Sequence, residues 1–145
     1  RVDIAGAIDA DGVHLGDADL PVEVARESLG EDAIVGRSVS FVEDAREAQR
    51  AGADYLGVGA IYATGSKDDI DEEEYAIGLD RLESIVEAVD IPVVGIGGVD
   101  ASNAGDVAAA GADGVAVITA ITGAADPESA TRRLGAAVQA GRTDG

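Results

Sequence analysis

A four-residue motif that occurs twice constrains the fold of this chain more than any other feature. Ala-Gly-Ala-Asp stands at Ala51–Asp54 and again at Ala110–Asp113, each time after a helical pattern and before a short apolar run. Glycine ends a helix readily in the left-handed conformation, and the residues after it then lead into a strand. Ala10-Asp11 before Gly12 is a shorter copy of this junction. The motif predicts a succession of β/α units.

Five apolar runs rich in Val, Ile and Gly are the predicted strands. They are Gly12–Gly16, Ala33–Ser38, Tyr55–Tyr62, Ile91–Gly97 and Gly114–Thr119. Their apolar character is nearly continuous, which is typical of parallel strands buried on both faces. Their starts, near residues 12, 34, 55, 91 and 114, lie 22, 21, 36 and 23 residues apart. The long step carries extra residues at 63–77, where β/α proteins place functional loops.

Helical patterns alternate with these runs. They cover Pro21–Leu29, Phe41–Ala51, Leu79–Val89, Ser102–Ala110 and Pro127–Ala140, with Asp126 as the expected N-cap of the last, and the chain begins in a helical pattern. The alternation predicts one parallel α/β domain over residues 1–145. The pattern alone fits both a (β/α)8 barrel and an open doubly wound sheet.

The composition excludes several classes of protein. The 145 residues contain no Cys, which excludes disulfides and thiol chemistry, and no apolar run approaches the roughly 18–20 residues that span a bilayer. With 29 acidic and 10 basic residues the net charge is −19, so electrostatic binding of nucleic acid is excluded. We expect a cytoplasmic protein with no membrane partner. The spread of acidic residues and a single lysine, Lys67, favour adaptation to high salt over an acidic mesophilic protein.

Two glycine-rich strand ends are candidates for phosphate binding. Gly97 and Gly98 follow a predicted strand and precede a helix, where backbone N–H groups can approach an anion. The run that ends in Ile118 and Thr119 comes one unit later, and this pair of loops holds phosphate in many barrels. A dinucleotide fingerprint fails because Asp100 stands where it needs glycine. The alternative is that these glycines serve packing alone.

Three other strand ends carry polar residues. Thr64, Ser66 and Lys67 open the long loop and suit a phosphoryl group, unless the loop is an ordinary surface loop. Asp17 and Asp19 are candidate magnesium ligands, although Asp19 also suits an N-cap. Three further polar residues stand in or after these strands. We favour a structural role for His14, whereas Ser38 would face the site and Ser40 would cap the next helix.

In their order along the whole chain, these motifs resemble the thiamine-phosphate synthase family. The residues that carry the resemblance are GVHLG-D-A-D, GRSVS, ADYLGVGAIYATGSK, IPVVGIGGV and AGADGVAVITAI. The resemblance implies a (β/α)8 barrel of which this chain would supply strands four to eight, the C-terminal part. It implies a magnesium-dependent transferase that couples hydroxymethylpyrimidine pyrophosphate with hydroxyethylthiazole phosphate, giving thiamine phosphate and pyrophosphate.

The resemblance also implies residue roles. Asp19 would bind Mg2+, Lys67 would neutralise the leaving pyrophosphate, and Ser38 would lie beside the pyrimidine. The thiazole phosphate would be held by Thr64, Ser66, Gly97, Gly98, Ile118 and Thr119. The family's first three β/α units, with further pyrophosphate and magnesium ligands, have no counterpart here, so we expect this chain alone to be inactive.

Three other functions stay open at this stage. A thiazole tautomerase shares the fold but uses a histidine near the serine loop, where this chain has Ser40. A half-barrel could bind a phosphorylated ligand without catalysis or complete itself as a homo-oligomer. Another phosphate-binding barrel, such as a sugar-phosphate isomerase, would usually need a carboxylate or cysteine base at a strand end.

Overall fold

The structure is a computed structural model that describes residues 1–63 and 76–144. Its strands are β1 (Gly12–Leu15), β2 (Ile34–Val39), β3 (Tyr55–Val58), β4 (Val93–Ile96) and β5 (Gly114–Ala116). Its helices are α1 (Val2–Ala7), α2 (Val22–Leu29), α3 (Val42–Arg50), α4 (Gly78–Val86), α5 (Ala104–Ala109), α6 (Thr119–Thr122) and α7 (Pro127–Asp144). Every predicted strand and helix forms, and the short helix α6 is an addition that the sequence did not predict.

The predicted third strand is too long. β3 ends at Val58, and the apolar residues that follow it turn across the end of β4 instead of extending the sheet. The N–H of Ile61 donates to the Ile96 carbonyl at 2.9 Å, and the N–H of Tyr62 donates to the Gly97 carbonyl at 3.0 Å. Ile61 is fully buried, so its apolar character serves the core and not the strand.

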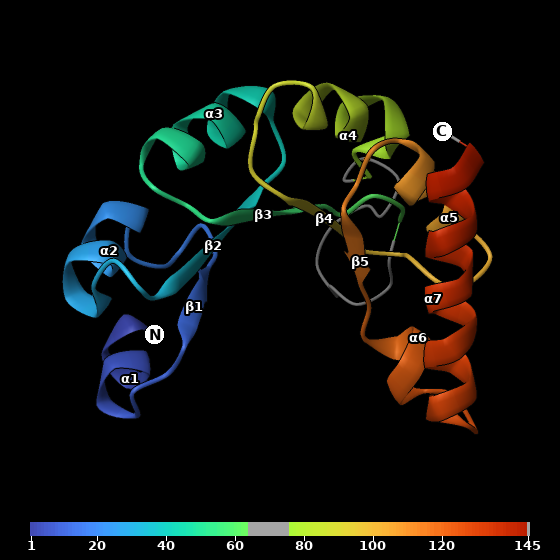
Figure 1. Cartoon of the computed structure of the whole chain (residues 1–145), viewed down its shortest axis with the longest axis horizontal. Coiled ribbons are helices and arrows are strands. Elements are labelled where there is room, and N and C mark those ends of the chain that lie inside the picture. The colour runs from blue at the N-terminus through green and yellow to red at the C-terminus, as the bar shows by residue number, and fades with distance from the viewer. Residues whose placement is uncertain (64–75, 145) are drawn as a thin grey trace.

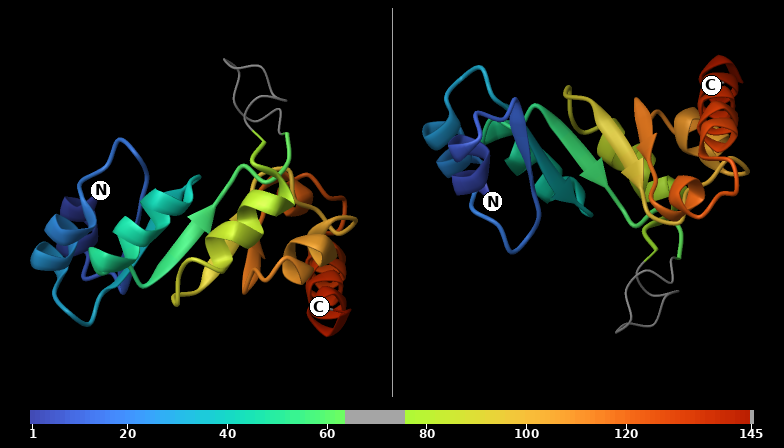
Figure 2. Two further views of the ribbon diagram at one scale, coloured as in Figure 1. Left: turned by 90° about the horizontal axis from the view of Figure 1, so that it is seen from above. Right: turned by 90° about the horizontal axis from the view of Figure 1, so that it is seen from below.

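The five strands form one parallel sheet in the order β1-β2-β3-β4-β5. Because crossovers between parallel strands are right-handed, an order that never reverses places all the crossover helices on one face. Figure 1 shows this arrangement, with the strands in an arc and α2, α3, α4 and the α5–α7 pair along its outer side. Figure 2 shows the same layer from above and below. A doubly wound sheet reverses its order, so that alternative does not describe these strands.

The paired residues give the register of the sheet. Gly12 of β1 pairs with Ile34 of β2. Gly36 pairs with Tyr55 of β3, so Ile34 lies level with Ala53, two residues before Tyr55. Leu56 pairs with Val93 of β4, and Val94 pairs with Gly114 of β5, so Tyr55 lies level with Ala112, two residues before Gly114.

The outward face of the sheet forms the core with the helices. Side chains that alternate along the strands are fully or almost fully buried against the helices: Leu15, Val35, Leu56, Val58 and Val93. Leu82 and Ile85 of α4 and Val107 of α5 are buried from the helix side. Each such side chain stabilises the fold by about 1.5–3 kcal/mol.

The repeated Ala-Gly-Ala-Asp motif has a structural role that two aspartates perform. Asp54 donates its N–H to the Val35 carbonyl at 2.8 Å and accepts the Val35 N–H on Oδ2 at 2.7 Å. Asp113 does the same with Val93, at 2.8 Å for each bond. We call these two pairs the aspartate clamps. Each clamp fixes the amino end of a strand to the amino end of its neighbour.

An arginine supports each clamp. Arg26 donates to Oδ2 of Asp54 at 2.7 Å and to the Gly52 carbonyl at 2.7 Å. Burial raises the pKa of Asp54, but the Val35 N–H and the Arg26 guanidinium together outweigh it and hold that pKa below its usual value. Arg142, near the end of α7, donates to the carbonyl of Asp113. Both arginines therefore fasten a helix to the amino ends of the strands.

Helix α7 lies closely against α5. A Cβ atom at Gly141 would collide with the backbone carbonyl of Gly105, so both helices approach through glycine. Asp126 caps α7 as predicted, because its Oδ1 accepts the Ser129 N–H at 3.1 Å. Within the described ranges, no helix has both the length and the apolar character needed to cross a membrane.

Candidate active site

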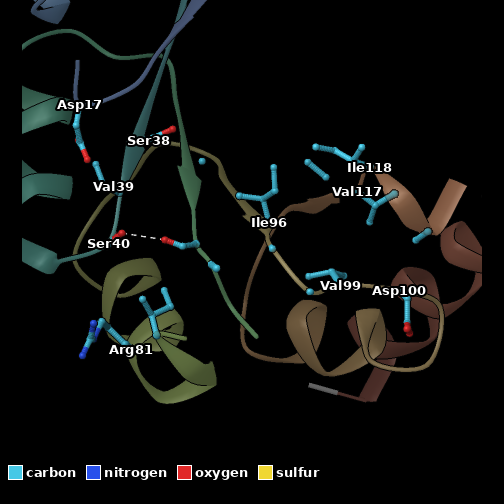
Figure 3. Close-up of a pocket in the computed structure, with 18 of the residues that line it drawn as sticks. Asp17, Ser38, Val39, Ser40, Arg81, Ile96, Val99, Asp100, Val117 and Ile118 are labelled. Carbon is cyan, nitrogen blue, oxygen red and sulfur yellow. Dashed lines mark hydrogen bonds between the residues drawn. The ribbon is translucent and has the colours of Figure 1, made fainter. Parts of the chain in front are cut away.

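A pocket of about 980 Å3 lies at the carboxyl ends of the strands. Parallel strands end at the same edge of a sheet, so residues far apart in sequence meet there. The predicted substrate-site residues Ser38, Gly97, Gly98, Ile118 and Thr119 line this pocket, and so do the candidates Asp17 and Ser40. Figure 3 shows Ser38 and Ser40 on one side of it and Ile96, Val99, Asp100, Val117 and Ile118 on the other.

The glycine side of the pocket is a tightly fixed loop. Gly97 and Gly98 have φ angles of 96° and 65°, and a Cβ at Gly98 would lie 2.7–2.9 Å from atoms of Tyr62 and Ala63. Only glycine satisfies both restrictions without strain. The Asn103 side chain holds the loop by donating to the Gly98 carbonyl at 3.0 Å and accepting the Asp100 N–H at 2.8 Å.

This loop is suited to an anion. Among the described residues, the N–H groups of Gly97 and Gly98 have no protein acceptor. The next loop, which contains Ile118, leads into α6 and lines the same pocket. Two neighbouring loops after the last two strands, with a short extra helix, form the common phosphate site of β/α barrels. The structure therefore places the predicted residues Gly97, Gly98, Ile118 and Thr119 around the same pocket.

The serine side of the pocket contains a hydrogen-bonded group that the sequence did not predict. Nδ1 of His14 lies 2.9 Å from the Tyr55 hydroxyl, and Nε2 of His14 lies 2.8 Å from the Ser38 Oγ. We call His14, Ser38 and Tyr55 the imidazole trio. Ser38 lines the pocket, whereas His14 and Tyr55 lie outside its lining.

Strand register assembles this trio. His14 pairs with Gly36, which pairs in turn with Tyr55, so two rings flank a residue without a side chain. A Cβ at Gly36 would collide with both rings. Ser38 pairs with Gly57, and a Cβ at Gly57 would lie 3.0 Å from Cε1 of His14. The two glycines thus provide the space that the histidine and tyrosine rings fill.

The charge of the imidazole is set by its surroundings. Burial and the positive charge of Arg37 both lower the pKa of His14, and the carboxylate of Asp19 opposes them. The net shift is downward from 6.5, so the imidazole is neutral at pH 7. A neutral imidazole has one donor nitrogen and one acceptor nitrogen, so the two hydrogen bonds of His14 have opposite directions.

Ser40 has a different role from the predicted helix cap. Its hydroxyl donates to the Gly59 carbonyl at 2.8 Å, and α3 begins after Phe41 with no side-chain cap. This bond, drawn in Figure 3, ties the end of β2 to the end of β3. Phe41 is exposed and lies under the guanidinium of Arg81, 5.0 Å from the ring centroid. Arg81 is the one cationic residue among the described residues that line the pocket.

The two candidate magnesium ligands take different positions. Asp17 lines the pocket and pairs with Arg37 at 3.0 Å. Asp19 accepts the Gly16 N–H on Oδ2 at 2.7 Å, and it does not cap α2, whose N-cap is Pro21. Its second oxygen has no partner in the described part of the chain, where no three potential ligands cluster. Asp19 therefore fits magnesium only as a single carboxylate ligand, which suffices where substrate phosphates complete the shell.

Three predicted site residues, Thr64, Ser66 and Lys67, lie outside the described residues. Taken together, the fold and the pocket define a class: a parallel α/β protein wound in one direction, with two neighbouring loops that line one pocket at the carboxyl ends of β4 and β5. The sequence model of the thiamine monophosphate synthase family matches residues 1–121, and the chain belongs to this family.

Individual relatives agree with this assignment. The chain is 70% identical over 98% of its length to a thiamine-phosphate synthase of Haloarcula marismortui, and 68% identical over 96% to one of Natronomonas pharaonis. It superimposes on the solved thiamine phosphate pyrophosphorylase of Pyrococcus furiosus with a TM-score of 0.85, at 46% identity over 98% of the chain. The chain spans 67%, 64% and 66% of the lengths of these three proteins.

Proposed function

We propose that the chain is part of a thiamine-phosphate synthase, a transferase that joins hydroxymethylpyrimidine pyrophosphate to hydroxyethylthiazole phosphate. One observation carries the proposal: the same pocket is lined by the glycine loop, whose N–H groups have no acceptor among the described residues, and by Ser38 on its other side. Such a pocket can hold a phosphorylated ring and a second heterocycle next to each other. Relatives named thiamine-phosphate synthase support the assignment.

The two sides of the pocket take different substrates. The backbone of Gly97, Gly98, Ile118 and Thr119 would hold the thiazole phosphate, together with Thr64 and Ser66. Ser38 would lie beside the pyrimidine. Lys67 would neutralise the pyrophosphate as a point charge, and Asp19 would bind a magnesium ion. When bound, this ion supplies positive charge to the pyrophosphate oxygens.

The reaction requires the protein to position the two substrates and to neutralise the charge of the leaving group. The bond between the pyrimidine methylene carbon and the pyrophosphate oxygen breaks, and the electron pair leaves with the oxygen. The thiazole nitrogen then donates its lone pair to the methylene carbon and forms the new C–N bond. Lys67 stabilises the departing anion, and the glycine loop holds the thiazole in line. No protein nucleophile is needed.

We further propose that the sheet belongs to an eight-stranded barrel in which these strands are the fourth to the eighth. The support is the order of the strands, which never reverses, and the arc that they form with the crossover helices along its outer side (Figure 1). Among the described residues, no helix lies over the inner face of the arc (Figure 1), as the interior of a barrel requires. An open sheet leaves its edge strands β1 and β5 without partners on one side.

A chimera tests both proposals. The third of the Haloarcula marismortui protein that this chain does not cover would be joined to the chain, and thiamine phosphate formation would be measured in high salt. We expect turnover by the chimera and none by the 145-residue chain. Coupling by the chain alone would refute the need for a complete barrel. A folded but inactive chimera would refute the synthase assignment, and thiazole isomerisation by it would support the tautomerase instead.

The charge of −19 with a single lysine supports a further proposal, that the protein works in a salt-rich cytoplasm. In molar salt the Debye length is about 3 Å, so repulsion between surface carboxylates is screened. We expect the melting temperature to rise steeply between 0.1 and 2 M KCl. An unchanged melting temperature would contradict this proposal. Light scattering in the same buffers would show whether the protein forms a homo-oligomer.

A further inference from the structure

The imidazole trio connects the pocket to a residue behind it. His14 lies between the Tyr55 hydroxyl and the Ser38 hydroxyl, with one ring nitrogen directed to each. No other hydrogen-bond partner of the two hydroxyls is present among the described residues. The three side chains come from three adjacent strands, so the rigid sheet fixes their relative positions. Whatever Ser38 offers to a ligand therefore depends on the proton of His14.

Two arrangements of protons are possible. If Nε2 carries the proton, Tyr55 donates to Nδ1, Nε2–H donates to Ser38, and the Ser38 proton is free for the pocket. If Nδ1 carries the proton, Ser38 donates to Nε2 and presents only lone pairs to the pocket. The first arrangement is favoured because a phenol, with a pKa near 10, is a stronger acid and hence a better donor than an alkyl hydroxyl. The phenol is also the weaker acceptor, since its lone pairs are delocalised into the ring.

We propose that His14 is a positioning residue that accepts a hydrogen bond from Tyr55 and donates one to Ser38, so that Ser38 presents its hydroxyl proton to the pocket. Ser38 then favours a ligand with an exposed lone pair in the ring plane. A pyrimidine has such lone pairs on its ring nitrogens. The inference rests on the proposed function for the identity of this ring, but the direction of the hydrogen bonds does not depend on it.

The direction of the hydrogen bonds can be measured without substrate. Histidine labelled with 15N distinguishes a protonated ring nitrogen from an unprotonated one by chemical shift. In the chimera, the signals of His14 are those that disappear in His14→Gln; in the 145-residue chain His14 is the sole histidine. At pH 7.5 we expect a neutral ring with the proton on Nε2. Tyr55→Phe should shift the population toward the other tautomer, and Ser28→Ala, whose hydroxyl bonds only the Val24 carbonyl of its own helix, should not.

A predominant Nδ1–H tautomer, a charged ring at pH 7.5, or a spectrum that Tyr55→Phe leaves unchanged would each overturn the proposal. These outcomes concern the trio alone. They are therefore separate from failure of the proposed function, which would show as a folded chimera with the expected Nε2–H tautomer and no coupling.

The effect on the ligand is measured in the active chimera. We expect Tyr55→Phe and His14→Leu to lower kcat/KM for the pyrimidine pyrophosphate by roughly tenfold while the KM for the thiazole phosphate stays within twofold. His14→Gln, whose side-chain amide can still donate to Ser38, should restore part of the loss. A deaza pyrimidine that lacks the contacted ring nitrogen should be discriminated by the unsubstituted protein and not by Ser38→Ala. Equal loss for both substrates, or no rescue by glutamine, would indicate a merely structural role and overturn the proposal.

Discussion

The two ends of the strands are built in different ways. At the amino ends, Asp54 and Asp113 satisfy backbone groups of the neighbouring strand, and Arg26 and Arg142 fasten helices to them. At the carboxyl ends, Gly97 and Gly98 line a pocket with positive φ angles, and their N–H groups have no acceptor in the part of the chain that the structure describes. The polar groups at the amino ends bond to other parts of the fold, whereas those at the carboxyl ends are accessible to a ligand. The difference teaches that polar groups at the amino ends contribute to the fold, whereas the candidate ligand contacts lie at the carboxyl ends.

The largest expected effect comes from Gly97→Ala at the carboxyl end. Its φ of 96° does not suit alanine, and the added Cβ would lie 2.6 Å from Ala60. We expect a loss of about 2–4 kcal/mol in the free energy of unfolding. We also expect at least roughly tenfold weaker binding of thiazole phosphate, measured by calorimetry in the chimera. Gly114→Ala, which has open space around it, is the matched control and should be nearly neutral.

Asp54→Ala at the amino end should affect stability without affecting the pocket. It removes the acceptor for the Val35 N–H and for Arg26, whose side chain is only 15% exposed. We expect the free energy of unfolding to fall by about 1–3 kcal/mol in urea denaturation. The KM values of the chimera should not change, and Glu27→Ala on the surface of α2 serves as the control for loss of charge. A KM increase in Asp54→Ala would show that the two ends are coupled.

A smaller effect is expected from pH. The pKa of His14 is lowered in the folded protein, so the unfolded chain binds the proton more tightly. Stability from this group is complete above about pH 6.5 and is lost as the pH falls below that value, with a slope of at most about 1.4 kcal/mol per pH unit. Denaturation between pH 7.5 and 5.5 should show this slope, and His14→Gln should abolish it. The same slope in both proteins would exclude His14 as its origin.

The smallest effect lies away from both ends. Gly135 is on the exposed side of α7, where a methyl group on its Cα would have no atom within 4 Å, and its environment is that of an ordinary helix. Gly135→Ala should raise the free energy of unfolding by about 0.5–1 kcal/mol, because alanine loses less conformational entropy in a helix. Thermal denaturation measures the gain. Destabilisation instead would show that α7 has a neighbour on this side.

Local sequence features predicted the strands and helices well wherever the residues of one element alone determine its structure. The apolar runs and the helix-ending glycines located all five strands. Ile61 shows the limit of this reasoning, because an apolar residue after a strand looks the same whether it extends the strand or turns into the core. The order of the strands depends on contacts between units, so periodicity alone could not distinguish a sheet wound in one direction from a doubly wound one.

The residues of the candidate site also fall into two groups, those with a local sequence signal and those without one. Gly97 and Gly98 were identifiable because a local backbone requirement leaves a local signature in glycine. His14 and Tyr55 were not assigned to the site, since their positions depend on which residues the strand register sets side by side. Arg81 was not assigned because its position at the pocket depends on how α4 packs. The one available signal was the pair of glycines, Gly36 and Gly57, on neighbouring strands. Their small size is explained only by the rings that fill the space above them.

The aspartate clamps also affect how the sheet unfolds locally. One clamp joins β2 to β3 and the other joins β4 to β5, whereas the described contacts between β3 and β4 at this end are backbone bonds alone. Strands held in pairs should open in pairs, as cooperative units of local unfolding. Hydrogen exchange at the amides of Val35 and Val93 should then report two separate opening reactions. Among the described residues, neither the β3–β4 boundary nor the β1–β2 boundary has a clamp, so we expect the sheet to divide first along these two lines.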